Sequence, residues 1–83
     1  MYEITKPAIK CKDGFTMSVQ DSEHHYCNVG VSSEVGFPSE QEELLMPYVE
    51  DKDRPTETVY AYVPNSIIEK VIKKHGGLND SNR

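Results

Sequence analysis

A strand pattern that runs directly into a helix pattern constrains the fold of this chain most strongly. Residues 56–63, "TETVYAYV", are rich in β-branched and aromatic side chains, which are favoured in strands. Alternation along this strand places Tyr60 and Tyr62 on one face and the aliphatic side chains on the other. Pro64 follows, and the apolar period then changes to that of a helix.

That helix is expected at about residues 66–75. Ser66 and Glu69 have the spacing of a capping box, in which the two side chains satisfy free amides at a helix start. The isoleucines and valine that follow form one apolar stripe, and basic residues stand near the negative end of the helix dipole. Gly76 and Gly77 are expected to close the helix in the left-handed conformation.

Two strands joined as an antiparallel hairpin are expected earlier in the chain. Residues 14–20 alternate apolar and polar side chains after the turn-prone pair Asp13-Gly14. Residues 24–31, "HHYCNVGV", are interpreted as the second strand of the hairpin. Residues 34–37 form either a third short strand or a continuation of the second through a bulge.

A short helix is expected at about residues 40–46. Ser39 and Glu42 have the spacing of another capping box, and Pro47 cannot continue helical hydrogen bonding. Strands that precede and separate two helices predict an α+β fold: a small, mainly antiparallel sheet with the short helix and the C-terminal helix packed on it.

A chain of 83 residues has room for one small domain, expected over residues 1–78 with a frayed tail at 79–83. The mean hydropathy of -0.64 indicates a thin core. A thin core leaves open a homo-oligomer, because association or a bound ligand would add stability.

Acidic side chains outnumber basic ones by 14 to 9, which gives a net charge of -5. This balance argues against direct binding of nucleic acid or an anionic membrane, because phosphate contacts require Lys and Arg. The N-terminus has no apolar run of the signal-peptide kind, and no stretch approaches the roughly 20 apolar residues that a membrane span requires. A cytoplasmic protein with reduced thiols at Cys11 and Cys27 is therefore expected.

The stretch "SEHHYCN" at residues 22–28 gathers two of the three histidines and one of the two cysteines. Neighbouring side chains of a strand point to opposite faces, so His24 would lie with Tyr26, and His25 with Cys27. At most one of these pairs can then contribute to a single site.

Tyrosines form the leading candidate for a ligand site, since they supply five of the seven aromatic side chains. Tyrosine is favoured where one end of a ring is buried and the other meets a partner. A stack of Tyr26 with Tyr60 or Tyr62, beside His24, could hold a flat ligand, although ordinary packing in a sheet explains the same residues.

Carboxylates form the second candidate, a surface that docks on a basic partner. They lack the alternating pattern of a calcium loop, and a simply solvated helix and loop would have the same composition. The candidate docking residues are Glu40, Glu42, Glu43, Glu50, Asp51 and Asp53.

Cysteine chemistry is the third candidate. Cys27 could act as a nucleophile with a histidine as its base, but His25 lies some 6–7 Å along a strand from it at about 3.3 Å per residue. A zinc site would need Cys11 as well, and the two cysteines do not have the spacing of a metal motif. No metal, cofactor or catalytic residue is therefore predicted.

Several blocks, "DGFTMSVQ", "HYC", "VGFPS", "ELLMPY", "PTETVYAYVP" and "KHGG", resemble those of a group of small phage- and prophage-encoded proteins of Firmicutes. The resemblance covers roughly Lys10 to Gly77 and brings no established catalytic residues. It implies a phage accessory protein that acts in the bacterial cytoplasm by binding a host protein or a small signal molecule, such as an anti-defence inhibitor or a sequestering protein. A small enzyme that uses Cys27 and a homo-oligomeric structural component are the alternatives.

Overall fold

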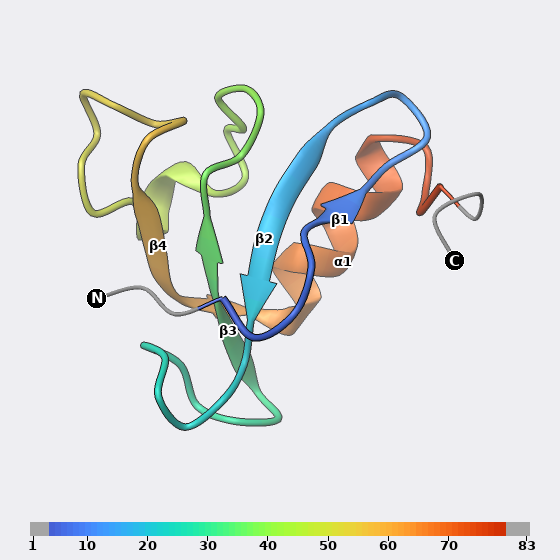
Figure 1. Cartoon of the computed structure of the whole chain (residues 1–83). Helices are drawn as coiled ribbons and strands as arrows, with labels where there is room; N and C mark the ends of the chain where they lie inside the picture. Colours follow the sequence, from blue (N-terminus) through green and yellow to red (C-terminus); the bar gives the residue numbers. More distant parts are fainter. Residues whose placement is uncertain (1–3, 80–83) are drawn as a thin grey trace.

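The computed structural model describes residues 4–79, which form a four-stranded antiparallel sheet and a C-terminal α-helix (Figure 1). The α+β fold expected from the sequence is therefore confirmed. The strands lie side by side in the order in which they occur in the chain. In chain order, the elements are β1 (Ile9–Lys10), β2 (Thr16–Gln20), β3 (Ser32–Gly36), the 3-10 helix η1 (Met46–Tyr48), β4 (Val59–Pro64) and α1 (Asn65–Lys74).

One face of the sheet is apolar and packs against α1, which lies behind β1 and β2 in Figure 1. Each large apolar side chain that folding removes from water contributes about 1.5–3 kcal/mol, so this small cluster supplies much of the driving force. The buried members of the core are Cys11, Phe15, Met17, Val35, Leu45, Tyr60, Val63, Ile68 and Val71.

The opposite face of the sheet is polar, and the segment before β1 lies on it. Gln20 is fully buried there. Its side-chain oxygen accepts hydrogen bonds from the backbone N–H groups of Thr5 and Lys6, both at 3.0 Å. Its side-chain nitrogen donates to the Lys6 carbonyl and to Ser18 Oγ, both at 2.9 Å. The Gln20 side chain thus satisfies backbone groups of the segment before β1 that would otherwise need hydrogen bonds from water.

The expected strand at residues 24–31 is wrong. Residues 21–31 form a loop, and the partner of β2 is β3, which begins at Ser32 as a strand of its own. Polar side chains explain the difference, because they offer the backbone local hydrogen bonds in place of a strand ladder. Ser22 Oγ accepts from the His24 N–H at 3.2 Å, and Ser32 Oγ accepts from the Asn28 N–H at 2.8 Å.

The short helix expected at about residues 40–46 is also wrong. A turn at residues 43–45 leads into η1, which has Pro47 in its first turn. The expected capping box fails because its two side chains bind elsewhere. Ser39 Oγ accepts from the Thr16 N–H at 3.0 Å, and Glu42 Oε2 accepts from the Leu44 N–H at 2.9 Å.

The C-terminal helix is confirmed, with a start different from the one expected. Pro64 stands at the N-cap and no side chain caps the helix, so the predicted capping box of Ser66 is absent. The end follows the prediction: Gly76 and Gly77 both have φ of 91°, and the Gly77 N–H donates to the Ile72 carbonyl at 2.9 Å.

Of the tail expected to fray at residues 79–83, only Asn79 falls within the described residues. Its N–H donates to the Lys10 carbonyl at 2.9 Å, so the chain continues along the outer edge of β1 after α1 ends.

Candidate functional site

A bulge in β4 redirects Tyr62. Glu34 of β3 lies opposite two residues of β4, Ala61 and Tyr62, so the alternation of side chains shifts by one position at this point. Tyr60 is completely buried, whereas 51% of Tyr62 is exposed. The prediction that the two tyrosines share a face is therefore wrong, because the pairing with β3 introduces an extra residue that the sequence pattern does not reveal.

The backbone of Tyr62 adopts a left-handed conformation, with φ of 53°. Glycine adopts this conformation freely, whereas for other residues it costs roughly 1–2 kcal/mol. Among residues 4–79, Phe37, with φ of 51°, is the other non-glycine residue with positive φ. Such strain persists only where surrounding contacts enforce it, and it is concentrated at functional sites.

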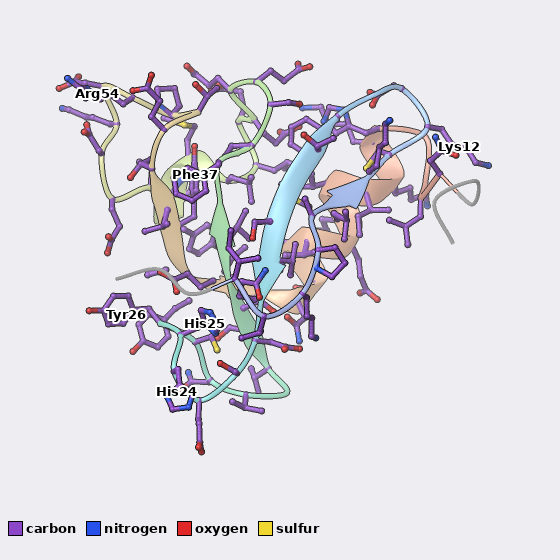
Figure 2. All side chains as sticks on the ribbon, viewed as in Figure 1. Lys12, His24, His25, Tyr26, Phe37 and Arg54 are labelled. Carbon is purple, nitrogen blue, oxygen red and sulfur yellow. The ribbon has the colours of Figure 1, made fainter. Side chains whose placement is uncertain are left out.

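Tyr26 provides one of the contacts that enforce the conformation of Tyr62. The Tyr62 N–H donates to the Tyr26 carbonyl at 2.9 Å. The Tyr26 N–H in turn donates to Oε1 of the buried Glu34 at 3.3 Å. Both backbone polar groups of Tyr26 are therefore bonded to the sheet, while 59% of the residue is exposed. Figure 2 shows Tyr26 projecting outward beside the loop.

Two valines in the same loop are also exposed, Val29 by 64% and Val31 by 68%. The Val31 carbonyl accepts a hydrogen bond from the Asn65 N–H at 3.0 Å, which fixes the loop to the start of α1. We refer to Tyr26 and Tyr62, whose backbones this loop joins by a hydrogen bond, as the loop patch. Single exposed apolar residues are common, but here the exposed side chains stand on a backbone that polar contacts hold in place.

The structure divides the four ligand-site residues predicted from the sequence. Tyr26 and Tyr62 come together through their backbones, and His24 is exposed on the same loop (Figure 2). Tyr60 belongs to the core: its hydroxyl donates to the Pro55 carbonyl, and burial raises the pKa of Tyr60. Tyr60 is therefore unavailable for a stack with the exposed tyrosines.

The expected pairing of His25 with Cys27 on one strand face does not occur, because the strand is replaced by the loop. His25 is buried, and its Nδ1 lies 2.6 Å from Ser22 Oγ. The Cys27 thiol donates to the Ser22 carbonyl at 3.5 Å. Burial raises the pKa of Cys27, and the negative charges of Asp21 and Glu34 raise it further. A raised pKa favours the thiol, whereas a nucleophilic cysteine requires the thiolate.

Cys11, like Cys27, has a raised thiol pKa. It is a free thiol buried in the core, and burial and the charge of Asp13 raise its pKa. Within the described part of the chain, no group of three or more His, Cys, Asp or Glu side chains could hold a metal ion.

A second cluster of polar residues surrounds His75, the residue that follows α1. His75 Nδ1 lies 2.5 Å from Asp13 Oδ2, and His75 Nε2 lies 2.7 Å from Glu42 Oε1. Lys74 Nζ donates to Glu42 Oε2 at 2.9 Å, and the ring of Phe15 stacks on that of His75 at 4.1 Å. We refer to Asp13, Glu42, Lys74 and His75 as the histidine network.

Opposing effects set the pKa values in the histidine network. Burial alone would lower the pKa of His75, but its hydrogen bonds to Glu42 and Asp13 and their charges raise it above the ordinary 6.5. Burial alone would raise the pKa of Glu42, but hydrogen bonds from Leu44, Lys74 and His75 lower it below the ordinary 4.5. The arrangement favours an imidazolium between two carboxylates, which stabilises the fold.

Glu42 was predicted to dock on a partner, and this assignment is wrong because its side chain is buried inside the histidine network. The remaining candidate docking residues are exposed and lie at the end of the sheet opposite the 21–31 loop (Figure 1). These exposed carboxylates are Glu40, Glu43, Glu50, Asp51 and Asp53.

Sequence reasoning missed the part that Glu34 plays beneath Tyr26. The only signal was a carboxylate inside the otherwise apolar block "EVGF". It also missed the histidine network, whose members Asp13 and His75 stand 62 positions apart.

The sequence matches no protein family model and no curated protein, and no solved structure matches the chain. Within residues 4–79, no helix has both the length and the apolar character that crossing a membrane requires.

Proposed function

We propose that this protein acts by binding, as a small phage-encoded accessory protein that inhibits or sequesters a host protein or small molecule in the bacterial cytoplasm. The observation that carries this proposal is the strained, exposed Tyr62 held in place by Tyr26. A glycine at this position would not have this backbone strain, so the conformational stability of the backbone does not favour a tyrosine here. We infer that the aromatic side chain serves binding.

The exposed tyrosines and the fixed backbone of the loop patch favour the binding of a partner. Exposed tyrosines offer a large rigid contact area with a polar tip, and they are enriched at protein interfaces. The hydrogen bonds of Tyr26 to Glu34 and Tyr62 keep the backbone of the patch fixed in the free protein. A surface that is ordered before binding loses less entropy when its partner arrives.

The two alternatives receive less support. An enzyme centred on Cys27 would need a lowered thiol pKa, and the surroundings of Cys27 raise it. A structural oligomer built by pairing sheet edges would need free backbone groups on the edge strands β1 and β4. On β1, the Lys10 carbonyl already accepts a hydrogen bond from Asn79. On β4, the Val59 carbonyl accepts from Glu50, and the Tyr62 N–H donates to Tyr26.

A comparison of two glycine variants tests the proposal. Tyr62→Gly removes the ring and the strain together, and Phe37→Gly does the same at a matched left-handed position outside the loop patch. Each chain is used to recover proteins from host extract, and native mass spectrometry of each purified chain detects any retained small molecule.

We expect the wild type and Phe37→Gly to retain the same partner, and Tyr62→Gly to lose it while remaining folded. A partner recovered equally by all three chains would contradict the proposal, and so would the absence of any partner on the wild type.

A further inference from the structure

A hollow in the protein surface lies at the C-terminal end of α1 and has a volume of about 400 Å³. Glu69, Ile72 and Lys73 line it from the helix, at the spacing of three and four residues that places side chains on one helix face. Gly76 and Gly77, in the turn that follows, complete the lining. We refer to these five residues as the helix-end hollow.

The helix-end hollow is separate from the loop patch. A Cβ atom on Gly76 would lie 3.4 Å from the Cβ of Lys12, so the hollow lies beside Lys12. Figure 2 shows Lys12 and Tyr26 on opposite sides of the molecule. A ligand of the hollow would therefore bind independently of the partner of the loop patch, and its binding is not part of the proposed function.

Backbone hydrogen bonds fix the wall that the two glycines form. The Gly76 N–H donates to the Lys73 carbonyl at 3.1 Å, and the Gly77 N–H donates to the Ile72 carbonyl at 2.9 Å. The Gly77 carbonyl accepts from the Lys12 N–H at 2.9 Å, which ties the wall to the segment after β1. The hollow is thus formed in the free protein, so a ligand would not have to order it.

The two charged side chains of the hollow are not paired with each other. A glutamate and a lysine four residues later on a helix are well placed to form an ion pair. Glu69 and Lys73 have this spacing, yet among residues 4–79 neither takes part in an ion pair. The neighbouring Lys74 instead binds Glu42 at 2.9 Å. The hollow therefore offers one carboxylate and one ammonium group to a ligand.

We propose that the helix-end hollow binds a small zwitterion with an apolar side chain, of the class of a free aliphatic amino acid. The carboxylate of the ligand lies against Lys73, and its ammonium group lies against Glu69. Ile72, which is only partly buried, provides an apolar surface for the side chain of the ligand. Four residues rise about 6 Å along a helix at about 1.5 Å per residue, a separation that two long side chains close onto one small molecule.

The charges and the size of the hollow disfavour other ligands. An anion without an ammonium group would leave Glu69 unpaired, and an amine without a carboxylate would leave Lys73 unpaired. Lys12 adds positive charge near the glycines, which orients the ligand with its carboxylate toward them. A volume of about 400 Å³ is near the lower end of the roughly 300–1,000 Å³ of pockets that hold small molecules.

Three matched probes test the inference by NMR on the isotope-labelled full chain. L-Leucine carries both charges, 4-methylpentanoate is the same molecule without the ammonium group, and 3-methylbutylamine is the same molecule without the carboxylate. We expect leucine to shift the amides of residues 69–77. Each of the other two probes should bind about threefold to fivefold more weakly, because it loses one ion pair near the surface.

Two variants show whether the named side chains are responsible. Lys73→Met should remove the preference for leucine over 3-methylbutylamine, and Glu69→Gln should remove the preference for leucine over 4-methylpentanoate. The matched control is Lys70→Met, at an exposed lysine of α1 that is not part of the hollow, and it should leave the three affinities unchanged. Spectra that match the wild type away from the mutated site establish that each variant is folded.

An absence of shifts at residues 69–77, equal affinity for the three probes, or equal effects of Lys70→Met and Lys73→Met would overturn the inference. Tighter binding of 4-methylpentanoate than of leucine would also overturn it, because the hollow would then be an anion site. These outcomes leave the partner recovered from host extract and its loss in Tyr62→Gly untouched, so failure of the inference and failure of the proposed function are distinguishable.

Discussion

Two buried glutamates serve opposite ends of this small sheet. Glu42 lies in the histidine network, where every charged group has a charged partner. Glu34 lies beneath the loop patch, where its carboxylate supports the backbone of Tyr26 and the tyrosine side chain remains in solvent. Figure 2 shows Tyr26 and Lys12, the neighbour of Asp13, on opposite sides of the molecule. One glutamate thus stabilises the fold, and the other presents a surface.

The largest expected loss of stability follows a substitution in the histidine network. Glu42→Ala leaves Lys74 and the buried His75 without their shared partner. Removing one member of a buried ion pair costs about 3–5 kcal/mol, which is a large part of the 5–15 kcal/mol by which a domain is usually stable. Denaturant unfolding monitored by circular dichroism measures this change.

The matched control is Glu43→Ala, because Glu43 is the exposed neighbour of Glu42. Its effect should lie within about 0.5 kcal/mol of the wild type. If the two variants lose equal stability, the histidine network does not stabilise the fold as described.

The second largest loss of stability is expected on substitution of Glu34. Glu34→Ala leaves the Tyr26 N–H without its carboxylate partner, which we expect to cost about 1–3 kcal/mol. Unlike Glu42→Ala, it should also raise hydrogen exchange at the amides of Tyr26 and Tyr62, because it loosens the support of the loop patch. Unchanged exchange at these two amides would remove the role assigned to Glu34.

The histidine network should make the stability of the protein depend on pH. The pKa of His75 is raised, so its stabilising contribution is complete below the ordinary 6.5 and is lost as pH rises through the higher folded value. The pKa of Glu42 is lowered, so its contribution is present above the ordinary 4.5 and is lost as pH falls through the lower folded value. Stability from the network is therefore greatest between these two pH values.

Unfolding free energies measured from pH 4 to 9 in the wild type, His75→Ala and His24→Ala check this window. Loss of stability above pH 6.5 should disappear in His75→Ala and remain in His24→Ala, since His24 is exposed on the loop. One titrating group limits the slope to about 1.4 kcal/mol per pH unit. A wild-type profile that His75→Ala leaves unaltered would exclude the imidazolium assignment.

The fold was predictable wherever one periodic pattern covers a whole element. The alternation in residues 14–20 and 56–63 and the apolar stripe of the last helix gave the sheet and α1. Residues 24–31 were misassigned because Ser22 and Asn28 form local turns that a count of β-branched and aromatic residues does not register.

The site was only partly predictable, because long-range pairing determines it. Tyr26 and Tyr62 could be selected as tyrosines, but the bulge that exposes Tyr62 depends on how β4 pairs with β3. Glu42 had the spacing of a capping residue, and only the folded chain brings it to His75. The sequence pattern therefore indicates residue chemistry, while the register decides which residues face solvent.

The smallest stability effect tests the central claim most directly. Tyr62→Gly should leave the free energy of unfolding unchanged or raise it by up to about 1 kcal/mol, because relief of the left-handed strain offsets the added flexibility of glycine. The same variant should lose the partner of the loop patch, and Tyr62→Phe, which restores the ring, should recover it. A Tyr62→Gly protein that is clearly less stable yet still binds would show that Tyr62 serves the fold and would contradict the account.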